Sequence, residues 1–178
     1  MLKIKRITPK FDDLDKVKHL MLNSFPDDEL TPFKQLFNKT ELKGYDFLAF
    51  YDENDLFNGI AYIITKNDLA FLFWLAVDEN SRSNGIGSQI LAELNKIYKD
   101  YRLILDIERL NDSASNNEQR IRRKAFYTRN GFFDSSLKYD LFNVEYQILT
   151  NKDDVGKNEF QNFYSYILEK ELHINYLS

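Results

Sequence analysis

Residues 69–77 form an unbroken apolar run, LAFLFWLAV, which is bounded by Asp68 and Asp78. A run of this length between two charged residues is typical of a strand that is buried on both faces in the middle of a sheet. Such a strand needs neighbouring strands beside it and covering elements above and below. The run therefore predicts a chain that is built around a central sheet.

The periodicity of the remaining segments predicts the elements around this strand. Apolar residues alternate with polar ones in the expected strands and recur with helical spacing in the expected helices. Further strands are expected at 2–7, 45–51, 56–65, 103–108, 132–139 and 143–149, and helices at 12–25, 27–37, 85–99, 118–130 and about 157–172. This order predicts an α+β (mixed α/β) fold in a single domain, residues 1–178, with its core at about 2–150. The central mixed sheet is expected to have about seven strands and to be flanked by helices, with a right-handed parallel crossover from 69–77 to 103–108.

The composition excludes several classes of function. The chain has 24 Lys and Arg against 28 Asp and Glu, and its net charge of −4 is opposite in sign to that of a typical nucleic-acid-binding domain. It has no Cys, which excludes disulfides, thiolate nucleophiles and Cys-ligated metals, and its two His residues are widely separated. No signal peptide and no membrane-length apolar segment are evident. We therefore expect a cytoplasmic protein that needs no membrane, no metal and no nucleic acid.

The segment after the apolar strand is the most informative about chemistry. Residues 77–88 read VDENSRSNGIGS, a short loop followed by a helix that opens with Gly85 and Gly87. Glycines let a ligand approach the backbone closely, and the first N–H groups of a helix are unpaired and carry a partial positive charge. With the permanent charge of Arg82, this loop is suited to phosphate. The alternative is that the glycines only relieve crowding at a tight turn.

Two well-known phosphate loops do not match this segment. Gly87 is followed by Ser88 and Gln89, whereas a Walker A loop requires Lys and then Ser or Thr. A dinucleotide-binding fingerprint requires a small residue where this chain has Ile90, and it lies near the start of a Rossmann unit. Here several strands are expected before the loop, so both assignments fail.

A third pattern fits. The spacing Arg82-x-x-Gly85-x-Gly87 resembles the acetyl-CoA loop of the GNAT superfamily of N-acetyltransferases. Residues 125–132, AFYTRNGF, resemble a later motif of the same family, a helix that ends in Phe-Tyr-x-x-x-Gly-Phe. The two motifs stand in the family's order, with one expected strand and a polar loop between them. The resemblance covers residues 2–149, most of the chain.

The resemblance implies how acetyl-CoA is bound. In the family the sheet is splayed between its fourth and fifth strands, here 69–77 and 103–108, and the pantetheine arm enters that gap. The arm pairs with strand backbone, which corresponds to Leu75 and Val77. Amides of the glycine loop hold the pyrophosphate, and the corresponding residues are Arg82, Asn84, Gly85, Gly87 and Ser88.

The resemblance also implies an acid and a further phosphate contact. Tyr127 matches the family's Tyr, which protonates the departing CoA thiolate, and a neutral phenol with a pKa of about 10 is suited to this. Helical spacing puts Arg120 and Lys124 on the same face as Tyr127, so that Arg120 is expected to contact a cofactor phosphate. Many relatives have Asn and Ala where this chain has Arg120 and Arg123. Without the flanking motif, Tyr127 would read as a core aromatic residue.

The acceptor amine must lose a proton before it attacks, and residues 103–108 offer two carboxylates. Strand alternation puts Asp106 and Glu108 on one face, apart from the apolar side chains. Glu108, nearer the strand end, is expected to act as the base or to anchor the amine. Glu29 or a chain of water molecules could act as the base instead of Glu108. The non-catalytic interpretation is that Asp106 and Glu108 are a solvated acidic pair at the end of a strand.

These features predict direct transfer of the acetyl group from acetyl-CoA to a primary amine through a tetrahedral intermediate. The acceptor, a small molecule or a peptide amine, is left open, as is whether the acyl group is strictly acetyl. The alternative is a non-catalytic acyl-CoA-binding or sensing module on the same fold. A third hypothesis, a nucleic-acid-binding protein, rests on the basic cluster at 120–124 alone. The negative net charge of the chain argues against it. Helically spaced apolar residues near the C-terminus indicate packing or a homodimer contact: Phe160, Phe163, Tyr164, Ile167 and Leu168.

Overall fold

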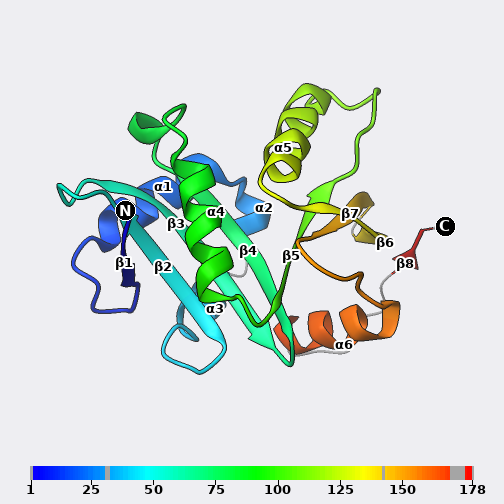
Figure 1. Cartoon of the computed structure of the whole chain (residues 1–178), viewed down its shortest axis with the longest axis horizontal. Helices are drawn as coiled ribbons and strands as arrows, with labels where there is room; N and C mark the ends of the chain where they lie inside the picture. Colours follow the sequence, from blue (N-terminus) through cyan, green and yellow to red (C-terminus); the bar gives the residue numbers. More distant parts are fainter. Residues whose placement is uncertain (1, 31–32, 142, 169–174, 178) are drawn as a thin grey trace. The chain divides into compact units, whose positions relative to one another are not determined.

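The computed structural model describes residues 2–30, 33–141, 143–168 and 175–177. The chain consists of two compact units, Met1–Lys99 and Asp100–Ser178, which we call unit 1 and unit 2 (Figure 1). Each unit has its own strands and its own helices. The single domain expected from the sequence stays a prediction.

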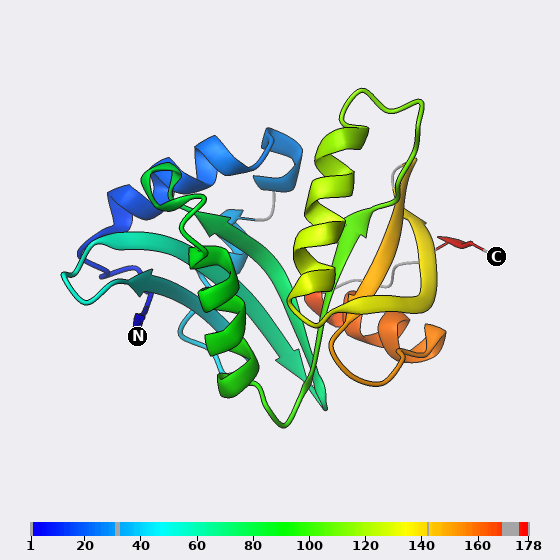
Figure 2. The ribbon, with the colours of Figure 1, turned by 45° about the horizontal axis from the view of Figure 1, so that its top comes forward.

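Unit 1 is an antiparallel sheet with helices on both faces (Figures 1 and 2). Its strands follow the order β1-β2-β3-β4, so that each pairs with its neighbour in sequence. The end of α1 and the helix α3 lie against one face, and α4 lies against the other. The elements are β1 (Lys3–Arg6), α1 (Leu14–Ser24), α2 (Asp27–Leu30), α3 (Phe33–Phe37), β2 (Tyr45–Tyr51), β3 (Phe57–Lys66), β4 (Leu69–Val77), the 3₁₀ helix η1 (Glu79–Ser81) and α4 (Ile86–Ile97).

The apolar run forms β4, and helices pack on both of its faces. Trp74 is 2% exposed, and its ring centroid lies 6.2 Å from that of Phe25 at the end of α1 and 5.9 Å from that of Phe33 in α3. On the other face, Ile90 of α4 packs against the backbone at Gly59 of β3. The core of unit 1 therefore extends over both faces of β3 and β4.

A β-bulge interrupts the pairing of β4 with β3. Leu72 and Trp74 lie opposite consecutive residues of β3. Phe73 between them therefore has no opposite residue. Beyond this bulge, Val77 lies opposite Gly59, on the face that carries α4, and Leu75 shares that face by strand alternation. Trp74 is on the face of α1 and α3.

The strands of unit 2 pair antiparallel with one another and have helices on both faces (Figure 1). Their order is β5-β7-β6-β8, so β5 and β6 both pair with β7. On the α5 face, Lys124 Nζ lies 2.6 Å from Asp134 Oδ2. On the α6 face, the rings of Phe160 and Tyr139 are 5.3 Å apart. The elements are β5 (Arg102–Glu108), α5 (Asn117–Arg129), β6 (Phe133–Leu141), β7 (Val144–Thr150), α6 (Lys157–Leu168) and β8 (Asn175–Tyr176).

The α+β class expected from the sequence is confirmed, and β4 spans the whole apolar run. Two short helices, α2 (Asp27–Leu30) and α3 (Phe33–Phe37), lie within the helix expected at 27–37, and residues 31 and 32 between them are outside the described residues. Nothing in the sequence predicts β8, and residues 169–172 of the expected C-terminal helix lie outside the described residues. The expected splay between 69–77 and 103–108 concerns how the two units meet and stays a prediction. In the described residues, no helix combines the length and the hydrophobicity needed to cross a membrane.

Gly59 provides a test of the packing in unit 1. A Cβ at this position would lie 2.4 Å from the carbonyl oxygen of Ala76 and 3.2 Å from Cδ1 of Ile90. We expect Gly59→Ala to lower the free energy of unfolding by about 1–3 kcal/mol, because the backbone of β4 must shift. Chemical denaturation measures this. Gly156→Ala is the control, since the nearest atom to its Cβ is 3.9 Å away, and equal stability of the two variants would contradict the close approach.

Candidate functional site

The loop that leads from β4 to α4 is held by side chains of unit 1. Asp78 accepts a hydrogen bond from the backbone N–H of Asn80 at 3.0 Å and so caps η1. The buried hydroxyl of Ser81 donates to Oδ1 of Asn58 at 2.7 Å, which attaches the loop to β3. The Nε of Arg82 donates to the carbonyl of Val77 at 3.1 Å. These contacts fix the path of the chain before α4 begins.

Gly85 makes the turn into α4. Its φ of 72° lies in the left-handed region, which glycine adopts without a steric penalty, and α4 begins at Ile86. Within the described ranges, the N–H groups of residues 84–88 have no hydrogen-bond acceptor. These N–H groups stand at the positive end of the α4 dipole, and the exposed guanidinium of Arg82 adds a full positive charge.

The structure therefore brings the sequence-predicted loop residues together at one helix N-terminus: Arg82, Asn84, Gly85, Gly87 and Ser88. Donors and positive charge are present without a nearby acceptor, which is the chemistry that a pyrophosphate requires. The alternative interpretation, in which the glycines only relieve crowding at a tight turn, explains the turn at Gly85. Unpaired amides are common to the first turn of every helix, so the exposed guanidinium of Arg82 beside them is what distinguishes this helix N-terminus as an anion site.

The backbone of Leu75 and Val77 is directed away from β3. Asp78 donates its N–H to the carbonyl of Asn58 in β3 at 2.8 Å. Because successive residues of a strand direct their N–H and C=O groups to opposite sides, those of Val77 and Leu75 are directed to the other edge of β4. The Val77 carbonyl already accepts a hydrogen bond from Arg82 Nε.

Tyr127 lies on α5 in unit 2 with its ring between two aromatic side chains. The ring centroids of Phe126 and Phe132 are 5.1 and 5.8 Å from that of Tyr127. Among the described residues, none forms a hydrogen bond with the Tyr127 hydroxyl. Burial raises the pKa of Tyr127 to about 12; the charge of Arg123 opposes the rise and that of Asp106 adds to it. The phenol is therefore neutral at pH 7, with its proton available to a ligand atom.

Glu108 and Arg120, which the sequence places in separate roles, are paired with each other. Arg120 Nη2 lies 2.8 Å from Glu108 Oε1, and their side chains are 15% and 23% exposed. Asn116 donates to the other carboxylate oxygen at 3.2 Å and accepts from Arg120 Nε at 2.9 Å. The pair joins the end of β5 to the first turns of α5. The other carboxylate considered as a base, Glu29, has its side chain outside the described part of the chain.

Asp106 has a partner that sequence reasoning missed. The hydroxyl of Tyr139 in β6 donates to Asp106 Oδ2 at 2.5 Å. Alternation along 103–108 correctly separates Asp106 from its apolar neighbours, but no local pattern points to a tyrosine 33 residues later. Only the pairing of β5 and β6 with a common strand, β7, brings the two side chains together.

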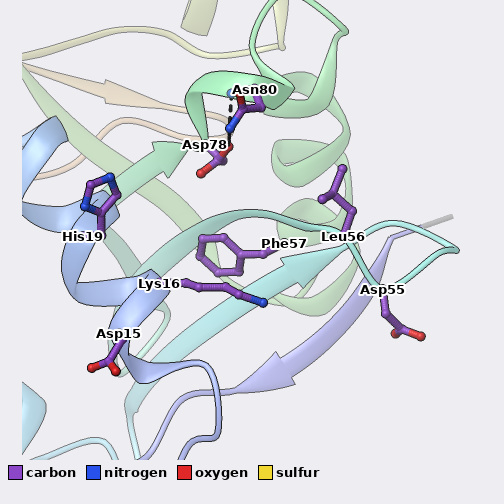
Figure 3. Close-up of a pocket in the computed structure, with 8 residues that line it drawn as sticks. All are labelled: Asp15, Lys16, His19, Asp55, Leu56, Phe57, Asp78 and Asn80. Atoms are coloured by element: carbon purple, nitrogen blue, oxygen red, sulfur yellow. Dashed lines mark hydrogen bonds between the residues drawn. The ribbon is translucent and has the colours of Figure 1, made fainter.

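Unit 1 also has a pocket of about 420 Å³ between α1, the turn that joins β2 to β3, and the start of η1 (Figure 3). Asp15, Asp55 and Asp78 line it, together with Lys16 and His19. Three carboxylates disfavour phosphate, so we assign the phosphate-binding role to the α4 N-terminus and not to this pocket.

The sequence matches a known family model over much of its length. The model of the acetyltransferase (GNAT) domain matches residues 43–133, just over half of the chain, and this range contains both the loop at 82–88 and Tyr127. The chain belongs to the GNAT acetyltransferase family. The family resemblance that the two motifs carry is thereby confirmed.

Solved structures share the GNAT fold with this chain. A GNAT-family protein from Bacteroides thetaiotaomicron gives a TM-score of 0.77 at 20% identity, covering 96% of this chain and 99% of its own. The ribosomal-protein-S18-alanine N-acetyltransferase of Escherichia coli gives 0.61 at 20% identity, covering 89% and 98%. An aminoglycoside 6'-N-acetyltransferase complexed with coenzyme A gives 0.64 at 14% identity, covering 86% and 99%. Among curated proteins, none matches the chain in sequence.

Gly87→Glu tests anion binding at the GNAT loop. The variant adds bulk and a negative charge among the free amides, and we expect the affinity for coenzyme A to fall about 100-fold or more. An acidic residue in the first turn stabilises a helix, so the variant should remain folded. Isothermal titration with coenzyme A measures the effect.

The matched control is Gln89→Glu, which adds the same charge to an exposed position of the same helix. We expect it to weaken binding only slightly. Unchanged affinity in Gly87→Glu, or an equal loss in the two variants, would contradict the assignment of the loop.

Proposed function

We propose that this GNAT protein is an N-acetyltransferase that transfers the acetyl group of acetyl-CoA to a primary amine. The observation that carries the proposal is the α4 N-terminus, where the N–H groups of residues 84–88 have no acceptor among the described residues and Arg82 stands beside them. A family model that includes this loop supports it, as does the fold shared with a GNAT enzyme complexed with coenzyme A.

The residues present fit acetyl-CoA. The amides of 84–88 and the guanidinium of Arg82 suit its pyrophosphate, and the N–H of Val77 with the outer backbone groups of Leu75 suits the amides of its pantetheine arm. Arg120, paired with Glu108, would have to exchange that partner to reach a phosphate. When bound, acetyl-CoA supplies an activated acetyl thioester.

Tyr127 is the proton donor in this proposal. Its hydroxyl has no protein partner among the described residues, and its raised pKa keeps it protonated over the physiological range. A phenol in this state stabilises the negative charge that grows on sulfur as the thioester carbon–sulfur bond breaks. Because the chain has no Cys, transfer is direct from thioester to amine.

The acceptor is a primary amine of a small molecule or of a peptide. Among proteins of this fold, one is named for the alanine of ribosomal protein S18 and another for aminoglycosides, so the fold accommodates both kinds. The rival proposal is a non-catalytic module that binds acyl-CoA. The unpartnered hydroxyl of Tyr127 favours the enzyme, because a binding module has no use for a proton donor at this position.

Acetyl-CoA binding and thiol release separate the two proposals. At 100 times the Kd, bound acetyl-CoA is expected to raise the Tm by roughly 5–10 °C, whereas NAD and ATP leave it unchanged. Thiol release with spermidine, an aminoglycoside or peptides with a free N-terminus or lysine then shows catalysis. Binding without release from any amine would favour the module, and no shift with acetyl-CoA would refute both.

Tyr127→Phe tests the proton donor. Removing the hydroxyl is expected to lower kcat by about 10²–10³-fold while leaving the Kd of acetyl-CoA nearly unchanged, because only the leaving thiolate needs that proton. Steady-state kinetics and titration measure the two quantities. Tyr98→Phe is the control, since it removes a phenol that is bonded to Asp46 in unit 1. Equal turnover of Tyr127→Phe and the wild type would remove Tyr127 from this role.

A further inference from the structure

Asn58 of β3 holds the chain at the point where it leaves β4 for α4. Its backbone carbonyl accepts the N–H of Asp78 at 2.8 Å, and its side-chain Oδ1 accepts the hydroxyl of Ser81 at 2.7 Å. Asn58 is 2% exposed and Ser81 is 4% exposed, so the bond between the two side chains is shielded from water. One residue therefore fixes both ends of the turn at 78–81, which precedes the loop at 82–88.

A β-bulge in β3 determines where Asn58 lies. Phe57 lies opposite Tyr51 of β2 and Gly59 lies opposite Phe50, which leaves Asn58 with no opposite residue. A bulge of this kind re-aims a side chain and is over-represented beside functional sites. Asn58 also stands just beyond the last pair that β3 forms with β4, so it reaches the residues that follow β4.

The loop at 82–88 has a second buried attachment, which lies beside the first on β3. After Ser81, the next buried residue is Ile90 of α4, and residues 82–89 between them are exposed or half-buried. A Cβ at Gly59 would lie 3.2 Å from Cδ1 of Ile90, so α4 packs directly on that glycine. Two consecutive residues of β3, Asn58 and Gly59, therefore hold the two ends of the segment that carries the unpaired N–H groups.

Between these attachments the loop has few other contacts. Among the described residues, only Arg82 bonds the loop to a strand, through its Nε and the carbonyl of Val77, and that bond is exposed to water. Ser83 has a φ of 66°, a left-handed conformation that is unfavourable for a residue with a side chain. A loop with no buried side chain and one such residue keeps its shape only while its ends are fixed. Loss of the attachment at Ser81 should therefore loosen the N–H groups without unfolding the sheet.

The other half of the Asn58 amide indicates that this residue contributes more than stability. Its Nδ2 is buried and has no hydrogen-bond partner among the described residues. A buried donor without an acceptor costs free energy of folding, and an apolar side chain at this position would avoid that cost. What the amide provides is the bond between its Oδ1 and Ser81, which acts on the loop and not on the core.

We propose that Asn58 is a positioning residue for the cofactor and acts through Ser81. The bond between them holds the N–H groups of residues 84–88 in the arrangement that receives the pyrophosphate of acetyl-CoA. Because Asn58 is buried, it contacts no phosphate itself. The inference rests on the cofactor of the proposed function and deepens it, since it names a residue outside the loop that sets the affinity of the loop.

A double-mutant cycle on coenzyme A binding tests this inference in the full chain. Asn58→Ala and Ser81→Ala each remove the bond, and each is expected to raise the Kd of coenzyme A about 5–10-fold, the worth of one buried hydrogen bond. Because both changes remove the same bond, the double variant should bind no more weakly than either single variant. Isothermal titration measures the Kd values. Unchanged Kd in the single variants, or losses that multiply in the double variant, would overturn the inference.

Ser135→Ala is the matched control. It also removes a buried hydroxyl that is bonded to a side chain, that of Asp154 in unit 2, and it lies outside the loop and both of its attachments. We expect a lower Tm with an unchanged Kd for coenzyme A. An equal loss of affinity in Ser135→Ala would show that general destabilisation is the cause, and it would overturn the inference.

Backbone dynamics provide a readout that needs no ligand. In Ser81→Ala, which leaves the strands of unit 1 unaltered, the ¹⁵N order parameters of residues 83–88 should fall below those of the wild type. The order parameters of residues 60–64 in β3 should not change, and neither should those of the loop in Ser135→Ala. A loop that is as ordered in Ser81→Ala as in the wild type would overturn the inference, and this comparison stands even if Asn58→Ala fails to fold.

Failure of the proposed function looks different. A wild-type protein that binds no coenzyme A would overturn the function and this inference together. A wild type that binds coenzyme A but acetylates no amine would overturn the enzyme alone, and the Kd values of the variants then decide this inference. A wild type that binds coenzyme A, with both single variants binding it equally well, would overturn this inference alone.

Discussion

Burial of β4 is the interaction on which unit 1 depends. Its residues contribute to the core on both faces, with Trp74 against α1 and α3 and the opposite face against α4. Because both faces are filled, the strand has little freedom to slide or rotate, and its end at Val77 is fixed. Arg82 is tied to that end, and α4 begins a few residues later. The position of the unpaired amides thus follows from apolar packing several residues away.

Unit 2 shows how environment separates two carboxylates that lie two residues apart on one strand. Glu108 is matched by a guanidinium, so its charge is compensated and it joins β5 to α5. Asp106 accepts a hydrogen bond from a neutral phenol, and the charge of Arg123 also acts on it. The same kind of side chain therefore forms an ion pair with a guanidinium in one position and a hydrogen bond with a phenol in the other.

Much of the fold could be read from the sequence because its strongest signals are local. The run at 69–77 and the helical spacing after Gly85 depend on neighbouring residues alone, and both elements are present. The bulge at Phe73 and the pairing of Tyr139 with Asp106 depend on register between strands, which no single segment encodes. At the site, the loop motif located the amides, whereas the partners of Glu108 and Asp106 required the tertiary structure.

The strand order of unit 1 has a consequence for how the chain acquires its structure. β2, β3 and β4 are consecutive hairpin strands, so most of their contacts join residues that are close in sequence, and such topologies fold quickly. In unit 2, β5 pairs with β7, which is reached only after α5 and β6. During synthesis from the N-terminus, the β2–β4 hairpins can form before the residues of β7 have been made. The pairing of β5 with β7, which completes the strand that carries both carboxylates, therefore forms only after the hairpins of unit 1 can have folded.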